Sequence, residues 1–163
     1  MMADRLEGEL TGTGKRFALV ASRFNDLVVE RLVGGARDAL VRHGVSEIDL
    51  LEVWAPGAYE LPVVAAALLR DRPDLDGLVV LGCVIRGDTA HFEHVAGPVA
   101  AQLAALARES VKPVGFGVLT TDNLEQALHR AGAKAGNKGW EAAMAVLETA
   151  NLLARIPGAP LRR

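Results

Sequence analysis

Hydrophobic and polar residues follow one another in blocks that predict strands and helices in turn. Continuous apolar runs, typical of strands buried on both faces, are each followed by a stretch with the period of an amphipathic helix. Strands are predicted at 17–21, 48–54, 78–85 and 114–119. Helices are predicted at 27–43, 59–70, 90–108 and 123–130, with a last helix after a glycine-rich loop at 132–139. Asp122 and Glu125 have the spacing of a capping box at the start of the fourth helix.

This alternation predicts an α/β fold, a three-layer sandwich with a four-stranded parallel sheet and helices on both faces. Residues 1–163 are expected to form one domain, because the chain shows neither a linker nor an internal repeat. Residues 1–15 precede the first strand and have no core of their own. This arm is expected either to lie against a neighbouring subunit or to be disordered, and the tail at 157–163 is expected to be frayed.

Composition narrows the class of protein. The net charge of −2 argues against a nucleic-acid partner, since such proteins carry a basic excess. A mean hydropathy of +0.21 fits either subunit contact surface or a generous core. Cys83, in an apolar run, is the single cysteine of the sequence. One cysteine excludes a disulfide framework and a cysteine-based zinc site. Neither a signal peptide nor a membrane span is recognised, so a soluble, cytoplasmic protein is expected.

Unusual residues gather where the predicted strands end, which is where parallel α/β sheets bind ligands. Of seven aromatic residues, four lie at or next to these ends, namely Phe24, Tyr59, Phe92 and Phe116. Such rings are either stacking platforms for a planar ligand or ordinary core and loop residues. After the third strand, backbone N–H groups, a hydroxyl and a helix N-terminus suit a phosphate group. His91, in the first turn of that helix, is a candidate for moving protons.

Simpler interpretations exist for several of these residues. Gly57 suits a tight turn, Glu60 suits a helix N-terminus, and His91 suits a hydrogen bond to a neighbouring turn. His91 and His94, three residues apart on one helix, suggest a metal pair. A third ligand is not evident in the sequence and the spacing is not that of a zincin, so no metal is expected.

Several motifs occur in the order and spacing of one family, over about residues 16–155. They are Arg23-Phe24-Asn25, the segment from Pro56 to Pro62, Val84-Ile85-Arg86-Gly87 with Thr89 and His91, 117–121, and 125–139. The chain thereby resembles the 6,7-dimethyl-8-ribityllumazine synthases of riboflavin biosynthesis. The resemblance implies a flavodoxin-like fold and a transferase that needs no cofactor. The implied reaction condenses 5-amino-6-(D-ribitylamino)uracil with 3,4-dihydroxy-2-butanone 4-phosphate, giving 6,7-dimethyl-8-ribityllumazine, phosphate and water.

The resemblance also implies which residues hold the ribitylaminouracil. Phe24 stacks on the pyrimidine ring, and Phe116 of a neighbouring subunit covers that ring. The ribityl chain is held by Asn25, Ala58 and Glu60, with Tyr59 beside them. The polar edge of the ring meets the backbone of Cys83, Val84 and Ile85.

For the phosphorylated butanone, the resemblance implies that Asp88 and Thr89 lie on the phosphate and that Arg130 supplies the counter-charge. His91 moves protons, and Lys138 lies near the ring and the phosphate. Asp88 departs from the commonest family pattern, which has a small or neutral residue. Because a carboxylate repels a phosphate, the backbone N–H of Asp88 is expected to face the ligand.

Assembly is likewise an implication of the resemblance. Members form pentamers, some of which close into icosahedral capsids of sixty subunits, and the loop at 134–139 resembles that of capsid-forming members. Two alternatives remain at this point. The chain could store or sense a flavin or lumazine without turnover, or it could act mainly as a capsid shell.

Overall fold

The computed structural model describes residues 4–134 and 136–158, so the end of the predicted tail, 159–163, lies outside the described residues. The strands are β1 (Phe17–Ser22), β2 (Leu50–Ala55), β3 (Gly77–Ile85) and β4 (Val114–Thr121). The helices are α1 (Asp26–Arg42), α2 (Leu61–Asp71), α3 (His91–Ser110), α4 (Leu124–Arg130) and α5 (Lys138–Arg155). Short 3₁₀ turns cover Glu47–Asp49, Ala58–Glu60 and Ile156–Gly158.

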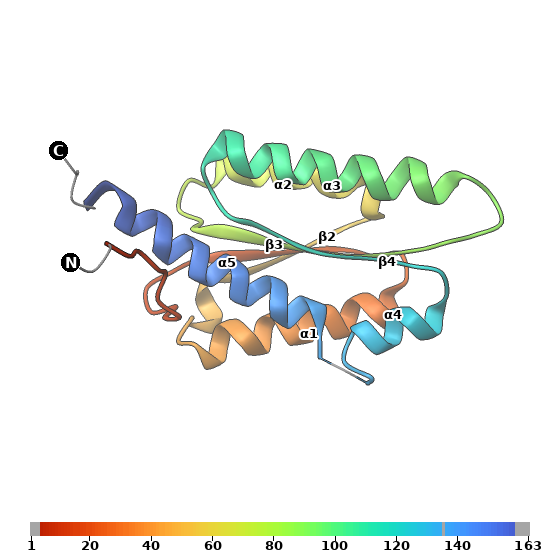
Figure 1. The fold of residues 1–163 in the computed structure, drawn as a ribbon, viewed down its shortest axis with the longest axis horizontal. Coiled ribbons are helices and arrows are strands. Elements are labelled where there is room, and N and C mark those ends of the chain that lie inside the picture. Colours follow the sequence, from red (N-terminus) through yellow and green to blue (C-terminus); the bar gives the residue numbers. More distant parts are fainter. Residues whose placement is uncertain (1–3, 135, 159–163) are drawn as a thin grey trace.

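The four strands form one parallel sheet in the order β2-β1-β3-β4. Helices α2 and α3 cover one face, and α1, α4 and α5 cover the other (Figure 1). The predicted three-layer α/β sandwich is therefore confirmed. The strand order is that of the flavodoxin-like doubly wound fold, in which the order reverses between β1 and β3. The carboxyl ends of these two strands, at the right in Figure 1, are where such a sheet places a ligand.

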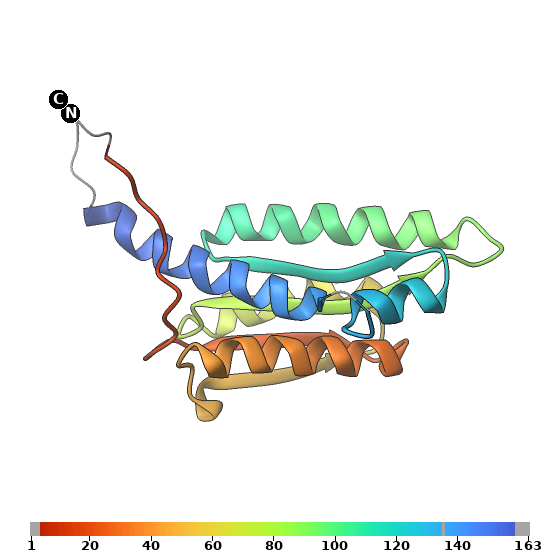
Figure 2. The same ribbon diagram turned by 60° about the horizontal axis from the view of Figure 1, so that its bottom comes forward.

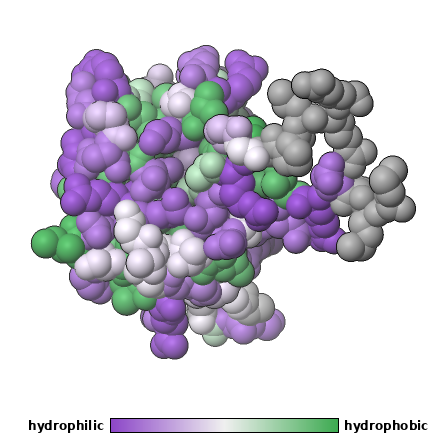
Figure 3. Space-filling view, turned by 90° about the vertical axis from the view of Figure 1, so that its left-hand side faces the viewer, coloured by the Kyte–Doolittle hydropathy of each residue, from purple (hydrophilic) through white to green (hydrophobic). Residues whose placement is uncertain are grey.

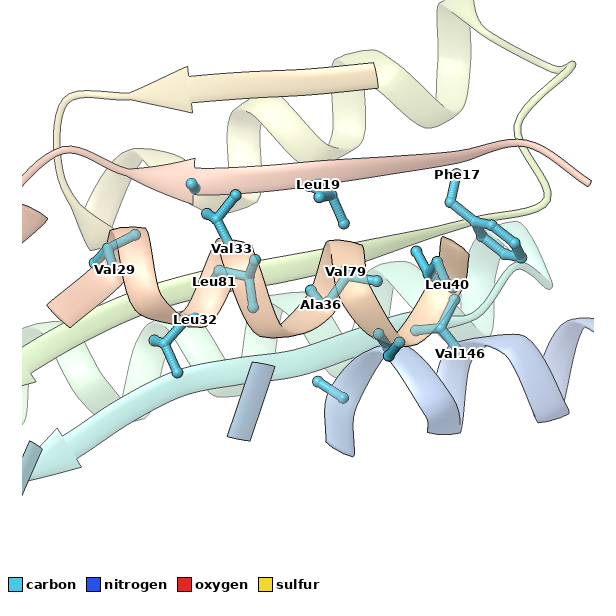
Figure 4. Packing of buried hydrophobic residues seen from close by; sticks show 14 of the residues in the cluster. Phe17, Leu19, Val29, Leu32, Val33, Ala36, Leu40, Val79, Leu81 and Val146 are labelled. Carbon is cyan, nitrogen blue, oxygen red and sulfur yellow. The ribbon is translucent and has the colours of Figure 1, made fainter. Parts of the chain in front are cut away.

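Burial of both faces explains why β1 and β3 are apolar throughout. Every residue of β1 is buried, as are the first eight residues of β3. On one face, Val29, Leu32 and Leu40 of α1 pack toward Leu19 and Leu81 of the sheet (Figure 4). Burying an aliphatic side chain of this size contributes about 1.5–3 kcal/mol. These contacts hold the carboxyl ends of the two central strands in place.

Two local predictions are wrong. Ile48 does not begin the second strand but lies in the 3₁₀ turn Glu47–Asp49, with 89% of its surface exposed, and β2 begins at Leu50. An apolar residue next to a strand has the same pattern as the strand itself. The capping box also lies one residue further on. Asn123 Oδ1 accepts a hydrogen bond from Gln126 N at 2.9 Å, and Gln126 Oε1 accepts one from Asp122 N at 2.8 Å.

The described part of the N-terminal arm, residues 4–15, is ordered and packs on its own chain. Asn151 Nδ2 of α5 donates hydrogen bonds to the carbonyls of Glu9 and Thr11 at 2.7 and 2.9 Å. Gly12 N donates to the carbonyl of His43 at 2.7 Å. In Figure 2 the arm crosses α5, at the end of the molecule away from the strand carboxyl ends. Figure 3 looks onto that end, which is mainly hydrophilic.

Val111, just after α3, has backbone angles φ 52° and ψ 40°, in the left-handed region that β-branched residues rarely adopt. Val111→Gly is expected to raise the free energy of unfolding by about 1 kcal/mol, because glycine takes this conformation without strain. A urea titration at fixed protein concentration measures the change. Ala104→Gly, at an exposed position inside the same helix, is the matched control and is expected to destabilise by about 1 kcal/mol. An equal loss in both variants would contradict the strain at Val111.

Candidate active site

A cavity of about 530 Å³ opens at the carboxyl ends of β1 and β3. This volume lies in the usual range for small-molecule sites. Four segments supply its walls, which are the turn after β1, the turn after β2, the end of β3 and the first turns of α3. The lining residues are Phe24, Asn25, Gly57, Ala58, Tyr59, Glu60, Cys83, Val84, Ile85, His91, His94 and Val95.

Asn25 ties β1 to β3 at the point where the strand order reverses. Its Nδ2 donates a hydrogen bond of 2.9 Å to the carbonyl of Cys83. Its backbone is left-handed, with φ 60° and ψ 44°, a conformation that Asn tolerates better than most residues. Its carbonyl accepts from the N–H groups of Val28 and Val29, which begins α1. The Asn25 Oδ1 atom is left as an acceptor at the cavity.

Two aromatic rings stand out on the cavity wall. Phe24 is 73% exposed and Tyr59 is 66% exposed, which is unusual for such large apolar surfaces unless a ligand covers them. Gly57 lies between Phe24 and Glu60. A Cβ atom there would lie 3.1 Å from Glu60 Oε2 and 3.6 Å from Phe24 Cδ2. The glycine therefore leaves room for the Glu60 carboxylate and the Phe24 ring on the cavity wall.

The α3 wall carries two imidazoles. His91 and His94 are one turn apart and both line the cavity. Sequence reasoning weighed His94 only as a metal ligand and missed it as a cavity residue. The signal was present, because residues three apart on a helix share a face. Among the residues that the structure describes, there is no cluster of three His, Cys, Asp or Glu side chains that could hold a metal ion.

Cys83 contributes backbone rather than a reactive thiol. Its side chain is 3% exposed, and burial raises the pKa of the thiol to about 11. A protonated, buried thiol is a poor nucleophile at neutral pH. The polar groups that Cys83 offers at the end of β3 are therefore those of its backbone.

The loop between β3 and α3 carries Asp88 and Thr89. Both are exposed, and Thr89 Oγ1 accepts from His91 N at 3.4 Å. Within residues 4–134 and 136–158, the Asp88 carboxylate has neither a hydrogen-bond partner nor an ion-pair partner. It is therefore free to turn away from a bound anion.

Five predicted site residues are not among those that line this cavity, namely Asp88 and Thr89 of the loop just described, and Phe116, Arg130 and Lys138. The prediction that Phe116 lies at or next to the carboxyl end of the fourth strand is wrong. The strand continues for five residues beyond it. Phe116 pairs with Val80 on the edge of the sheet and is half exposed. Arg130 ends α4 and Lys138 begins α5, in the layer that lies across the sheet from α3 (Figure 1). Lys138 Nζ pairs with Glu141 Oε2 at 2.7 Å.

The loop that joins Arg130 to Lys138 is attached to α1 through Asn137, its last residue. Asn137 Nδ2 donates to the carbonyls of Arg31 and Ala131 at 2.9 and 3.0 Å. Asn137 Oδ1 accepts from the N–H groups of Gly139 and Trp140 at 2.8 and 3.1 Å, which caps α5. Arg130 and Lys138 are therefore held on the α1 side of their own chain.

Fold and cavity together define a doubly wound α/β protein with a cavity of small-molecule size at its topological switch point. The family model described as 6,7-dimethyl-8-ribityllumazine synthase matches residues 14–154. The 6,7-dimethyl-8-ribityllumazine synthase of Aquifex aeolicus (strain VF5) is 53% identical over 146 residues, covering 90% of this chain and 94% of that protein. The synthase of the same name from Nitratidesulfovibrio vulgaris (strain DSM 19637 / Miyazaki F) is 51% identical over 151 residues, covering 93% and 96%.

The chain therefore belongs to the 6,7-dimethyl-8-ribityllumazine synthase family. It is a transferase of riboflavin biosynthesis, and the reaction of the family is the condensation given above. Among solved structures, a de novo designed Rossmann fold protein matches with a TM-score of 0.41 and 16% identity. That match covers 70% of this chain and 91% of the design, and at this score it adds nothing to the argument. None of the described helices is long and apolar enough to cross a membrane.

Proposed function

We propose that this chain carries out the condensation at a site shared between two copies of the chain. One observation supports this proposal above the others. The cavity holds a ring platform, a carboxylate and two imidazoles, whereas Arg130, Lys138 and Phe116 lie elsewhere on the same chain. A phosphorylated substrate needs a cation to balance its charge, and a substrate ring stacked on Phe24 has a second face still to be covered. A neighbouring copy would supply both.

In this proposal, the ribitylaminouracil lies along the β1 and β2 side of the cavity. Phe24 stacks on the pyrimidine ring, and backbone at Cys83, Val84 and Ile85 meets its polar edge. The ribityl hydroxyls reach the groups clustered at the β1 and β2 turns, which are Asn25, Ala58, Tyr59 and Glu60. Asn25 Oδ1 and the Glu60 carboxylate accept hydrogen bonds from these hydroxyls. Phe116 of a neighbouring copy closes the other face of the ring.

The phosphorylated butanone lies at the start of α3. Backbone N–H groups at Asp88 and Thr89, the Thr89 hydroxyl and the helix N-terminus suit its phosphate. Arg130 and Lys138 of a neighbouring copy supply positive charge.

The reaction proceeds by attack of an amine on the ketone, loss of phosphate and closure of the ring on a second carbonyl. Each step moves a proton, and in this proposal His91, which lines the cavity, receives and returns it. Carbonyl condensation with an aromatic amine is intrinsically easy. The main contribution of the site is therefore to hold two reactants in register.

A shared site requires contact between copies of the chain. We propose a pentamer as the basic unit, with closure into an icosahedral capsid of sixty subunits as its larger form. Residues 1–163 act in it as one domain. Sedimentation of the purified protein distinguishes the two sizes. A cytoplasmic location is proposed for the enzyme, in keeping with the sequence, which has one cysteine and so cannot form an intrachain disulfide.

The activity is tested by mixing the purified protein with the two substrates and following lumazine absorbance and fluorescence. The rate without enzyme is subtracted, because the uncatalysed condensation contributes. Saturable formation in both substrates is expected. Binding of the ribitylaminouracil or of riboflavin without acceleration would contradict catalysis and favour a protein that stores or senses the ligand.

A further inference from the structure

Arg86 connects three elements at the edge of the cavity. Its backbone N–H donates to the carbonyl of Thr121 at the end of β4, at 2.8 Å. Its Nε donates to Asp122 Oδ1 at 3.1 Å, and its Nη1 pairs with the carboxylate of Glu93 in the first turn of α3. Its guanidinium carbon lies 4.4 Å from the centroid of the Phe92 ring. One side chain thus spans the ends of β3 and β4 and the start of α3.

These contacts engage the Arg86 guanidinium within its own chain. By sequence it is the cation nearest to Asp88 and Thr89, and therefore the obvious counter-charge for the phosphate. A planar guanidinium held by two carboxylates and an aromatic face is fixed in direction. Its charge is balanced by Glu93 and Asp122, so it is not the spare cation that a phosphate requires.

The four residues between Arg86 and α3 have little else to hold them. In the part of the chain that the structure describes, the Asp88 side chain makes neither a hydrogen bond nor an ion pair. The hydrogen bond from His91 N to Thr89 Oγ1, at 3.4 Å, is long. A Cβ atom at Gly87 would meet nothing within 4 Å. The position of the loop therefore depends on its two ends, which Arg86 joins.

We propose that Arg86 is a positioning residue that holds the first turn of α3 against the end of β4. It thereby sets the place of His91 and of the loop 87–90 relative to the cavity. This inference rests on the proposed function, in which that loop holds the phosphate and His91 moves protons. Phe92 follows His91 in the first turn of α3, and its contact with the Arg86 guanidinium limits rotation of the helix about its axis.

The contribution of Arg86 to global stability is expected to be small. Its side chain is 47% exposed, and those of Glu93 and Asp122 are 53% and 68% exposed. Exposed ion pairs of this kind stabilise a folded protein little. A short loop at a cavity, in contrast, opens locally at a small cost in free energy. Removal of Arg86 should therefore disturb the site before it disturbs the fold.

The test compares Arg86→Gln with Arg70→Gln. Arg70 is an exposed arginine of α2 whose Nε and Nη2 donate hydrogen bonds to the Asp71 carboxylate at 2.8 and 2.7 Å. Its replacement therefore removes a similar surface ion pair away from the loop 87–90. Arg86→Gln is expected to raise KM for the phosphorylated butanone about tenfold and to lower kcat about tenfold. A displacement of a catalytic group by about 1 Å can lower the rate by ~10²-fold. KM for the ribitylaminouracil is expected to stay within about twofold, and the melting temperature to match that of Arg70→Gln.

Two further variants keep the test decisive. Arg86→Lys keeps the charge but loses the fork and the stacking, and is expected to be intermediate. Glu93→Gln should reproduce part of the effect on KM and kcat. In the double variant, Arg86→Gln should lower activity by a smaller factor than it does in the otherwise unchanged enzyme, because the effects of substitutions in one network are not additive. Kinetics of Arg86→Gln equal to those of Arg70→Gln would overturn the proposal. So would equal rises in KM for both substrates together with a lower melting temperature, which indicate a purely structural role.

Failure of this inference differs from failure of the proposed function. If His91→Ala slows turnover while Arg86→Gln does not, the site stands and the positioning role is wrong. If neither variant affects a measurable condensation, the assignment of the site itself is wrong, and the positioning role is wrong with it.

Discussion

Replacing Arg130 with alanine is expected to raise KM for 3,4-dihydroxy-2-butanone 4-phosphate by about 10- to 150-fold, which corresponds to ~1.5–3 kcal/mol for a hydrogen bond to a charged group. In the proposed site, Arg130 supplies the charge that Arg86, paired with Glu93 and Asp122, does not. KM for the ribitylaminouracil is expected to change little, since that substrate carries no phosphate. Steady-state kinetics with each substrate varied in turn measure the two constants.

Arg108→Ala is the matched control for this prediction. Arg108 is an exposed arginine in the last turn of α3, far along the helix from His91. Its removal takes the same charge from the protein and should leave both constants unchanged. Equal effects of Arg130→Ala on the two substrates would reject its role as the phosphate counter-charge. Equal effects of the two arginine variants would indicate a dependence on net charge alone.

His91→Ala is expected to lower kcat by roughly 10- to 100-fold, toward the low end of what general acid–base groups contribute. The loss is moderate because positioning of the two reactants, rather than proton transfer, supplies most of the acceleration. His91 lines the cavity from the first turn of α3, so the substitution removes an imidazole without touching the core. Single-turnover rates with both substrates saturating isolate the chemical step.

His129→Ala serves as the control for His91→Ala. His129 lies on α4, which covers the face of the sheet opposite α3, and its Nε2 lies 3.8 Å from Glu125 Oε1. The His129→Ala variant should have the kcat of the unchanged enzyme. A loss beyond about four decades in His91→Ala would contradict the view that the reaction is intrinsically easy. The residual activity would then have to come from the uncatalysed reaction alone.

Most of the fold was predictable because each strand and helix is determined by the hydrophobic pattern of its own segment of sequence. The apolar runs at β1 and β3 are long and uninterrupted, since both strands are buried on both faces. Helix periods were equally clear, and the observed helices begin and end within a few residues of the predictions. Ile48 was misassigned because its hydrophobicity resembles that of the strand it precedes, although it is exposed. Single-residue boundaries depend on hydrogen bonds that the sequence does not specify.

The site was predictable only in part, for a different reason. The residues after β1, β2 and β3 meet because the carboxyl ends of parallel strands share one edge of the sheet. Phe116 could not be placed, since its position along β4 depends on how far that strand continues. Arg130 and Lys138 belong to another layer of the same chain, so no rule about strand ends could bring them to the cavity. Their roles therefore stay predictions from the family resemblance.

A mixture of two impaired chains tests the shared site most directly. Chains carrying His91→Ala and chains carrying Arg130→Ala are co-expressed with different tags, and assemblies containing both are isolated. If each site takes its cavity from one copy and its cation from the next, random mixing restores about a quarter of the sites to the unchanged residues, as expected for a closed ring with one kind of interface. The account predicts that kcat/KM for the phosphorylated butanone recovers to about that fraction of the unchanged enzyme. A mixture no more active than the average of the two variants alone would contradict it.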